Sequence, residues 1–325
     1  MMDRRTLGRT LVALLAASPL ALVAQATGAR RIGYLGNGFP VATSTQLDSF
    51  RQGLRESGWV EGQNLTIEYR WANGDSARLP QLVAELVRAR VDLIVLSGSP
   101  AIRAARQATR TLPIVFVVLS DPAEAGLVSS LARPGGNMTG LSSQFKELIT
   151  KQLQLLKELV PNLSRLALLQ PLEIGPAVVA AAEATAQRLG FTARRLGVSS
   201  PAEFEGAFAT ARKERMDAVQ VLPSPFFSVH RTLLIELAAR HRLPAFYEFK
   251  GYVQEGGLIS YGPNIDDMWT RSARYVDRIL KGANPGELPI EQAAKFELAI
   301  NLKTAAALGL TVPPALVQRA DDVIS

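Results

Sequence analysis

Two short polar segments follow apolar runs in the first half of the chain and could bind a charged ligand. Ser97 and Ser99 come after the run 91–96, and Pro100 follows them. Proline is common in the first turn of a helix, where backbone N–H groups have no intrahelical acceptor and favour negative charge. We therefore predict that Ser99 is a helix N-cap. We also predict that Ser97, Ser99 and the free N–H groups of the helix turn that opens at 100–102 bind a carboxylate.

The second segment contains the acidic candidate. Ser120 and Asp121 follow the apolar run 113–119 and precede Pro122. Two roles remain open for Asp121: its carboxylate can accept hydrogen bonds from a ligand ammonium, or it can cap the turn that Pro122 begins. Ser120 is a further candidate for hydrogen bonding to the ligand.

Other candidate binding residues follow the remaining apolar runs. Ligands of open α/β sheets lie outside the carboxyl ends of the strands, so the residues just beyond each strand can reach them. Hydroxyl, amide and carboxylate groups beside aromatic walls are typical of a small-molecule pocket. Each aromatic could instead pack in the core, and Phe226 and Tyr247 have the least core-like surroundings. These further candidates are Asn37, Phe39, Gln170, Pro223, Phe226, Tyr247 and Tyr261.

Residues that catalysis would need are scarce. The chain has no cysteine and two histidines, His230 and His241, which excludes thiolate metal sites and a cysteine nucleophile. The G-x-x-x-x-G-K-[ST] and G-x-S-x-G motifs do not occur. Gly33, Gly36 and Gly38 are spaced G-x-x-G-x-G, unlike a dinucleotide-binding loop. We predict no catalytic residue, no metal ligand and no cofactor.

The elements that must position these residues alternate between strands and helices. Apolar residues recur at helical spacing in 76–90, whereas 91–96 and 113–119 are continuous apolar runs. Continuous apolar strands between amphipathic helices indicate parallel sheets that are covered on both faces. The alternation of strands and helices is interrupted at 133–140 (RPGGNMTG) and then resumes. The predicted fold is therefore α/β, with two doubly wound parallel-sheet lobes.

Length and composition agree with two lobes. The chain has 325 residues, of which 47% are apolar, and this is more than one core usually needs. We expect lobe 1 to comprise 31–140 with about 262–290, and lobe 2 to comprise 141–261 with about 291–325. A multi-strand hinge is predicted near 136–142, 260–264 and 287–294. The net charge of +7 includes no Lys/Arg run longer than two residues, so nucleic acid is not an expected partner.

The N-terminus has the pattern of a secretory signal peptide. A basic segment, an apolar stretch over 11–24 and the small-residue site Ala24-Gln25-Ala26 follow one another. We predict cleavage after Ala26, which makes residues 1–26 the signal peptide, and a periplasmic mature protein. The alternative is an uncleaved membrane anchor. Export is expected by the Sec route, with Arg4-Arg5 as a weak indication of the twin-arginine route.

The mature chain resembles the ABC transporter substrate-binding proteins of the tryptophan/tyrosine-binding type. The matching strings include FRQGLRESGWVEGQNLTIEYRWANGD, SDPAEAGLVSSLARPGGNMTGLS, GGLISYGPN and YVDRILKGANPGELPIEQAAKFELAINLKTAAALGLTVPP. The resemblance covers essentially all of 31–324 and implies a type I periplasmic-binding fold. It also implies that two lobes close around a solute and deliver it to an ABC permease and its ATPase at the inner membrane.

Carried over to this chain, the resemblance assigns the loop 37–40, Ser97-Gly98-Ser99 and Ser120-Asp121-Pro122 to the crevice. Gln170 departs from the Asn expected before Pro171. The predicted solute bears a carboxylate, with amino acids and aromatic amino acids as candidate classes, and the protein is expected to be a monomer. The alternative function is an exported α/β enzyme acting on a small molecule. A ligand-sensing regulator would need a DNA-binding or signalling segment where the signal peptide stands.

Overall fold

The computed structural model describes residues 29–39, 45–118, 121–143, 145–172 and 174–325. The predicted signal peptide and Ser120 lie outside the described residues. No helix among the described residues combines the length and the apolar character that a membrane span requires.

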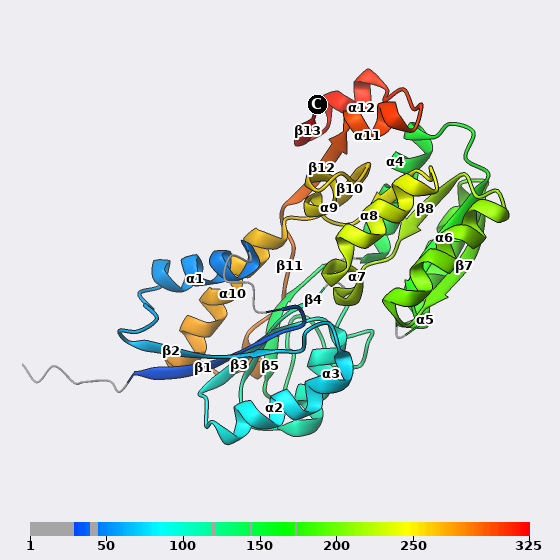
Figure 1. The fold of residues 1–325 in the computed structure, drawn as a ribbon. Helices are drawn as coiled ribbons and strands as arrows, with labels where there is room; N and C mark the ends of the chain where they lie inside the picture. The colour runs from blue at the N-terminus through cyan, green and yellow to red at the C-terminus, as the bar shows by residue number, and fades with distance from the viewer. Residues whose placement is uncertain (1–28, 40–44, 119–120, 144, 173) are drawn as a thin grey trace, which may run out of the picture.

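The first lobe is built on a six-stranded parallel sheet with the order β11-β5-β4-β3-β1-β2. Helices α1 and α10 cover one face, and α2 and α3 cover the other (Figure 1). Its strands are β1 (Arg30–Gly36), β2 (Leu65–Trp71), β3 (Leu93–Ser97), β4 (Ile114–Val118), β5 (Met138–Ser142) and β11 (Glu291–Gln292). Its helices are α1 (Thr45–Glu56), α2 (Leu79–Arg88), α3 (Ser99–Ala108) and α10 (Ile265–Leu280), with short 3₁₀ turns at Ser76–Arg78 and Pro285–Glu287.

The second lobe has a seven-stranded sheet with the order β13-β12-β10-β9-β8-β6-β7. Its pairs are parallel except β10 with β12, which run antiparallel. The strands are β6 (Arg165–Pro171), β7 (Thr192–Val198), β8 (Ala218–Val221), β9 (Ala245–Tyr247), β10 (Ile259–Pro263), β12 (Phe296–Asn301) and β13 (Asp322–Ile324). One face packs against α4 (Phe145–Leu159), α5 (Pro176–Arg188), α11 (Leu302–Ala307) and α12 (Pro314–Gln318). The other packs against α6 (Phe204–Lys213), α7 (Pro225–Val229), α8 (Arg231–Arg240) and α9 (Lys250–Gln254), and a 3₁₀ turn at Pro201–Glu203 precedes α6.

Local patterns explain most of these elements. Helix α2 buries Leu79, Leu82, Val83 and Leu86, which recur at the spacing of one helical face. Strand β3 is apolar from Leu93 to Leu96, because helices cover both faces of its sheet. The predicted fold class, two doubly wound α/β lobes, is confirmed.

The chain passes between the two sheets three times. It crosses after β5, after β10 and between β11 and β12. These connections fall within or beside the predicted hinge segments, whereas motion about them stays a prediction. Glu291 and Gln292 pair with β5 in the first sheet, although the sequence placed residues from about 291 in lobe 2.

Strand β5 is absent from the elements that the sequence predicts. Its five residues, MTGLS, have neither an apolar run nor clean alternation. Pairing with β4 and β11 makes it a strand. Gly140 permits a close approach to β4, because a Cβ atom there would overlap the backbone carbonyl of Phe116. The strand is fully buried between β4 and β11.

Candidate functional site between the two lobes

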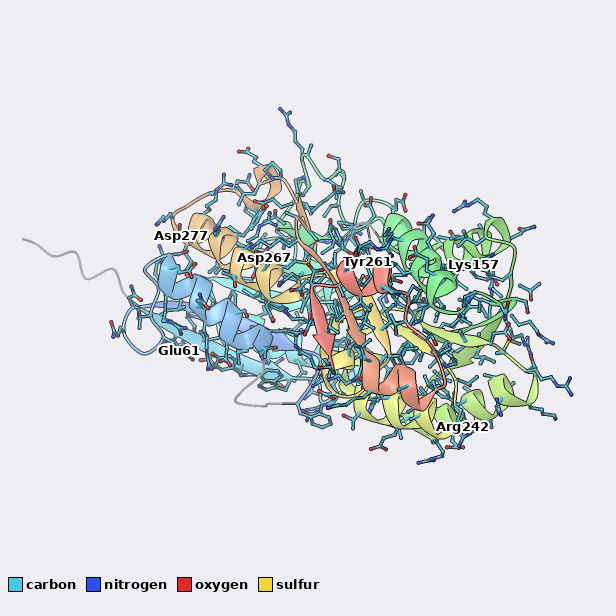
Figure 2. The ribbon with its side chains drawn as sticks, turned by 90° about the horizontal axis from the view of Figure 1, so that it is seen from above. Glu61, Lys157, Arg242, Tyr261, Asp267 and Asp277 are labelled. Carbon is cyan, nitrogen blue, oxygen red and sulfur yellow. The ribbon has the colours of Figure 1, made fainter. Side chains whose placement is uncertain are left out.

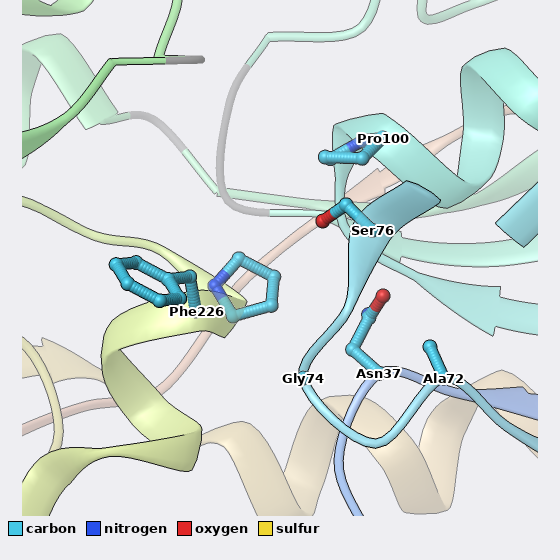
Figure 3. A pocket seen from close by; sticks show the side chains of 7 residues that line it. Asn37, Ala72, Gly74, Ser76, Pro100 and Phe226 are labelled. Atoms are coloured by element: carbon cyan, nitrogen blue, oxygen red, sulfur yellow. The ribbon is translucent and has the colours of Figure 1, made fainter. Parts of the chain in front are cut away.

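The two lobes meet where α7 contacts the loops that follow β1, β2 and β3. A narrow cleft lies at this contact, and Figure 3 shows Phe226 on one side with Ser76, Pro100 and Asn37 opposite. The cleft is lined by Asn37, Ala72, Gly74, Ser76, Pro100, Pro225 and Phe226. Two predicted ligand-binding residues, Asn37 and Phe226, are therefore brought together from opposite lobes.

Asn37 and Ser97 form a bridge between two loops of the first lobe. The Asn37 Nδ2 donates to the Ser97 carbonyl oxygen at 2.7 Å and to its Oγ at 3.3 Å. These bonds join the carboxyl ends of β1 and β3, which are neighbours in the sheet. The side-chain amide of Asn37 therefore positions the cleft loops.

Helix α3 begins one residue earlier than predicted. Gly98, with φ of +82°, is its N-cap, and Ser99 is the first helical residue, so the prediction of Ser99 as N-cap was wrong. The positive φ favours glycine at this position. The Ile102 N–H already donates to the Gly98 carbonyl oxygen at 3.2 Å, and Pro100 has no N–H. The helix terminus thus offers fewer free donors than the sequence suggested.

Gly98 also sits at the contact between the lobes. A Cβ atom on Gly98 would lie 2.8 Å from Cγ of Pro225 in α7. Gly74 and Gly38 lie under the same helix, where a Cβ atom would meet the side chain of Val229 at 3.3 Å and 3.6 Å respectively. Three glycines from three loops therefore let α7 approach the first lobe closely.

Asp121 caps a turn. Its Oδ1 accepts hydrogen bonds from the Ala123 N–H at 2.8 Å and from the Glu124 N–H at 3.2 Å. This is the second of the two roles that the sequence left open. Binding of a ligand ammonium by Asp121 stays a prediction.

We expect Asp121→Ala to lower the free energy of unfolding by about 1 kcal/mol, because two backbone N–H groups lose a side-chain acceptor. Urea denaturation measures this change, and calorimetric titration measures ligand affinity in parallel. A loss of affinity beyond tenfold with unchanged stability would assign Asp121 to the ligand instead.

The aromatic candidates separate into core and surface residues. Tyr247 is 1% exposed and its ring stacks on Tyr252 with centroids 4.7 Å apart, so the prediction that it is among the least core-like was wrong. Its side chain lies on the sheet face that α6, α8 and α9 cover, where burial raises the pKa of its hydroxyl. Phe39, by contrast, is 52% exposed beside the cleft loop.

Tyr261 and Phe226 are half-buried. Tyr261 lies near the middle of the molecule seen from above (Figure 2), and its ring stacks on Phe296 at 6.2 Å. Phe226 contacts the ring of His230 edge-on at 5.3 Å and also lines the cleft. Phe226 is thus the aromatic candidate that the structure brings to the contact between the lobes.

Gln170 and Pro223 stand at the carboxyl ends of β6 and β8, as predicted from sequence. Both are half-buried. The Oε1 of Gln170 is buried and has no hydrogen-bond partner in the part of the chain that the structure describes. It therefore retains an unused acceptor at the same edge of the sheet.

Sequence reasoning missed Glu248. This residue directly follows β9 and is 4% exposed, and neither carboxyl oxygen has a hydrogen-bond partner among the described residues. Burial raises the pKa of its carboxyl group to about 8. The rule that singled out Asp121, an acid just beyond a strand, would also have found Glu248 if it had been applied to the second lobe.

A second polar group near the crossings is already satisfied. Glu297 Oε1 lies 3.0 Å from the Lys250 Nζ and accepts from the Asn264 Nδ2 at 2.8 Å. Asn264 Oδ1 in turn accepts from the Asp267 N–H and caps α10. These contacts join β12, α9 and α10 and leave Glu297 paired, unlike Glu248.

Known proteins resemble the chain over most of its length. The sequence pattern of the ABC transporter substrate binding protein family matches residues 42–324. A tyrosine-binding protein of Clostridioides difficile (strain R20291) is 26% identical over 263 residues, which are 80% of this chain and 75% of that protein.

Two solved structures have the same architecture. A conserved domain protein from Vibrio cholerae superposes with a TM-score of 0.83 at 28% identity, covering 91% of this chain and 100% of that one. An ABC domain in complex with L-Trp from Streptococcus pneumonia superposes with a TM-score of 0.83 at 25% identity, with the same coverage. The resemblance inferred from sequence is confirmed, and the chain belongs to the family of ABC transporter substrate-binding proteins.

Proposed function

We propose that this protein binds a small carboxylate-bearing solute in the periplasm and delivers it to the permease and ATPase of an ABC importer. The observation that carries this proposal is the family match over 42–324 on a two-lobed fold whose lobes meet at a cleft. The exported-enzyme alternative is not favoured, because the family consists of substrate-binding proteins.

The solute class follows from the relatives and from the cleft. One relative is a tyrosine-binding protein and another was solved with L-Trp. The cleft combines an aromatic ring, Phe226, with hydrogen-bonding groups on Asn37 and Ser76. An amino acid, with an aromatic one as the first candidate, has the groups that these residues would contact, and the narrow cleft must widen to admit it.

Closure of the lobes is part of the proposal. Three chain crossings connect the sheets, and a few residues at such crossings can absorb the change in backbone angles. Helix α7 then forms the second lobe's side of the closed contact. X-ray scattering of the protein with and without a tight ligand tests this, and identical curves would contradict closure.

We expect a bound amino acid to be released when the purified protein is denatured, and mass spectrometry of the supernatant identifies it. Titration of the refolded, ligand-free protein with the twenty standard L-amino acids should reproduce that choice. If no amino acid is released and none binds, this solute class is wrong.

We expect the mature protein to begin at Thr27 in the periplasmic fraction, because Ala24-Gln25-Ala26 has the small residues of a cleavage site. N-terminal sequencing of the exported protein checks this. A chain that begins at Met1 in the membrane fraction would support an uncleaved anchor.

A further inference from the structure

Glu248 is a buried carboxyl group without a partner. It is 4% exposed, and both Oε1 and Oε2 lack hydrogen bonds within the described residues. Leaving a buried polar group unpaired is costly, and bound water, an ion, a ligand or a reaction can account for such a group. The carboxyl group therefore calls for a specific partner.

The place of Glu248 in the fold points toward the space between the lobes. It follows β9 at the carboxyl edge of the second sheet, the same edge as Gln170 and Pro223, and ligands of such sheets lie beyond this edge. On the neighbouring strand β10, just before the crossing to α10, a Cβ atom on Gly262 would overlap the Glu248 backbone carbonyl and come within 3.1 Å of its Cγ. Glycine at 262 is thus what makes room for this glutamate.

The surroundings of Glu248 contain no cation that pairs with it among the described residues. Lys250, two residues on in α9, is paired with Glu297 at 3.0 Å. Glu248 interacts electrostatically with the Tyr252 hydroxyl, also in α9, whose own pKa burial raises. On β10, Ser260 Oγ is buried and has no hydrogen-bond partner in the described part of the chain. The site therefore has unused hydrogen-bonding oxygens and a carboxyl group that no cation of the described residues pairs with.

We propose that Glu248 receives the ammonium group of the solute and thereby makes an amino group a requirement for binding. This inference rests on the proposed function, that of an amino-acid-binding protein. It moves the ammonium site from the first lobe, where the sequence placed it at Asp121, to the second lobe. The first lobe would then hold the carboxylate, so that one solute joins both lobes.

Binding should be coupled to proton release. With a pKa of about 8, the Glu248 carboxyl group is mostly protonated in ligand-free protein at pH 7. An ammonium placed against it favours the ionised form, so the carboxyl proton leaves to solvent as the solute binds. We expect close to one proton released for each solute bound at pH 7.

The experiment compares the wild type with Glu248→Gln and with Glu214→Gln. Gln keeps the shape of the side chain and cannot ionise. Glu214 is the matched control, because its carboxylate pairs with Arg194 at 3.2 Å on the edge strand β7. Each protein is titrated calorimetrically at pH 7 with the twenty standard L-amino acids and with the des-amino analogue of the tightest one (3-(4-hydroxyphenyl)propionate for L-tyrosine). Repeating each titration in two buffers of different ionisation enthalpy gives the number of protons released for each solute bound.

We expect Glu248→Gln to weaken binding of the amino acid by about ten- to a hundredfold and to abolish proton release. It should bring the affinity for the amino acid close to that for its des-amino analogue. Glu214→Gln should behave as wild type. Unchanged affinity, unchanged proton count or retained discrimination in folded Glu248→Gln would overturn this inference and leave the proposed function intact. Absence of binding by every amino acid to the wild type would overturn both.

Discussion

Ligand-free wild-type protein is expected to lose several kcal/mol of unfolding free energy between about pH 5 and pH 8, and the Glu248→Gln variant is expected to lose much less. The cause is the difference in the pKa of Glu248 between the two states, 4.5 for an ordinary glutamate and about 8 in the folded protein. Between these values the folded state holds a proton that the unfolded state has already lost. Unfolding therefore becomes easier by about 1.4 kcal/mol for each pH unit.

The direction of this effect is opposite to that of a salt-bridged carboxylate. The contribution of Glu248 to stability is fully present below about pH 4.5 and is lost as the pH rises through about 8. Urea denaturation at pH 5, 6, 7, 8 and 9 measures it, and the difference between wild type and variant removes the contribution of all other groups. Parallel curves for the two proteins would show that Glu248 is already ionised in the fold.

The second large effect concerns the contact between the lobes. We expect Gly98→Ala to weaken solute binding by about tenfold or more, because the new Cβ would lie 2.8 Å from Cγ of Pro225 and hold α7 away from the first lobe. The same substitution strains the backbone, since Gly98 has φ of +82°. That strain costs about 1–2 kcal/mol of folding free energy by itself.

Gly58→Ala separates the two effects. Gly58 has φ of +86°, and a Cβ atom there would meet nothing within 4 Å. We expect both variants to lose similar stability, whereas only Gly98→Ala loses affinity. Scattering of the liganded variant should also show a more open shape than the wild type. Equal affinities for the two variants would mean that the contact of α7 with the loop at Gly98 plays no part in binding.

Sequence patterns predicted the fold class because its elements are locally encoded. The helical spacing of Leu79, Leu82, Val83 and Leu86 specifies α2 without reference to the rest of the chain. Asn is a residue type that favours helix N-caps, and the Oδ1 of Asn301 accepts from the Thr304 N–H at 3.0 Å at the start of α11. The break and restart of the pattern at 133–140 predicted two lobes, and the ordered strings shared with a family agreed with that architecture.

Within the candidate site, sequence identified loops more reliably than roles. Asn37 and Phe226 were placed at the crevice because each follows a strand, and the cleft contains both. The sequence left two roles open for Asp121, binding a ligand ammonium or capping a turn, because an acid before proline can do either. The two hydrogen bonds to its Oδ1 show the cap.

The sequence by itself determined the two α/β lobes, because hydrophobic periodicity and the alternation of strands and helices along the chain are local properties, and its resemblance to a family indicated a substrate-binding protein. Only the tertiary structure decided which side chains reach the space between the lobes. Tyr247 and Glu248 are adjacent, yet Tyr247 stacks in the core on Tyr252, while Glu248 is a buried acid that has no hydrogen-bond partner among the described residues. Their surroundings differ because burial and pairing depend on neighbouring elements, such as Gly262 on β10, which folding brings beside Glu248.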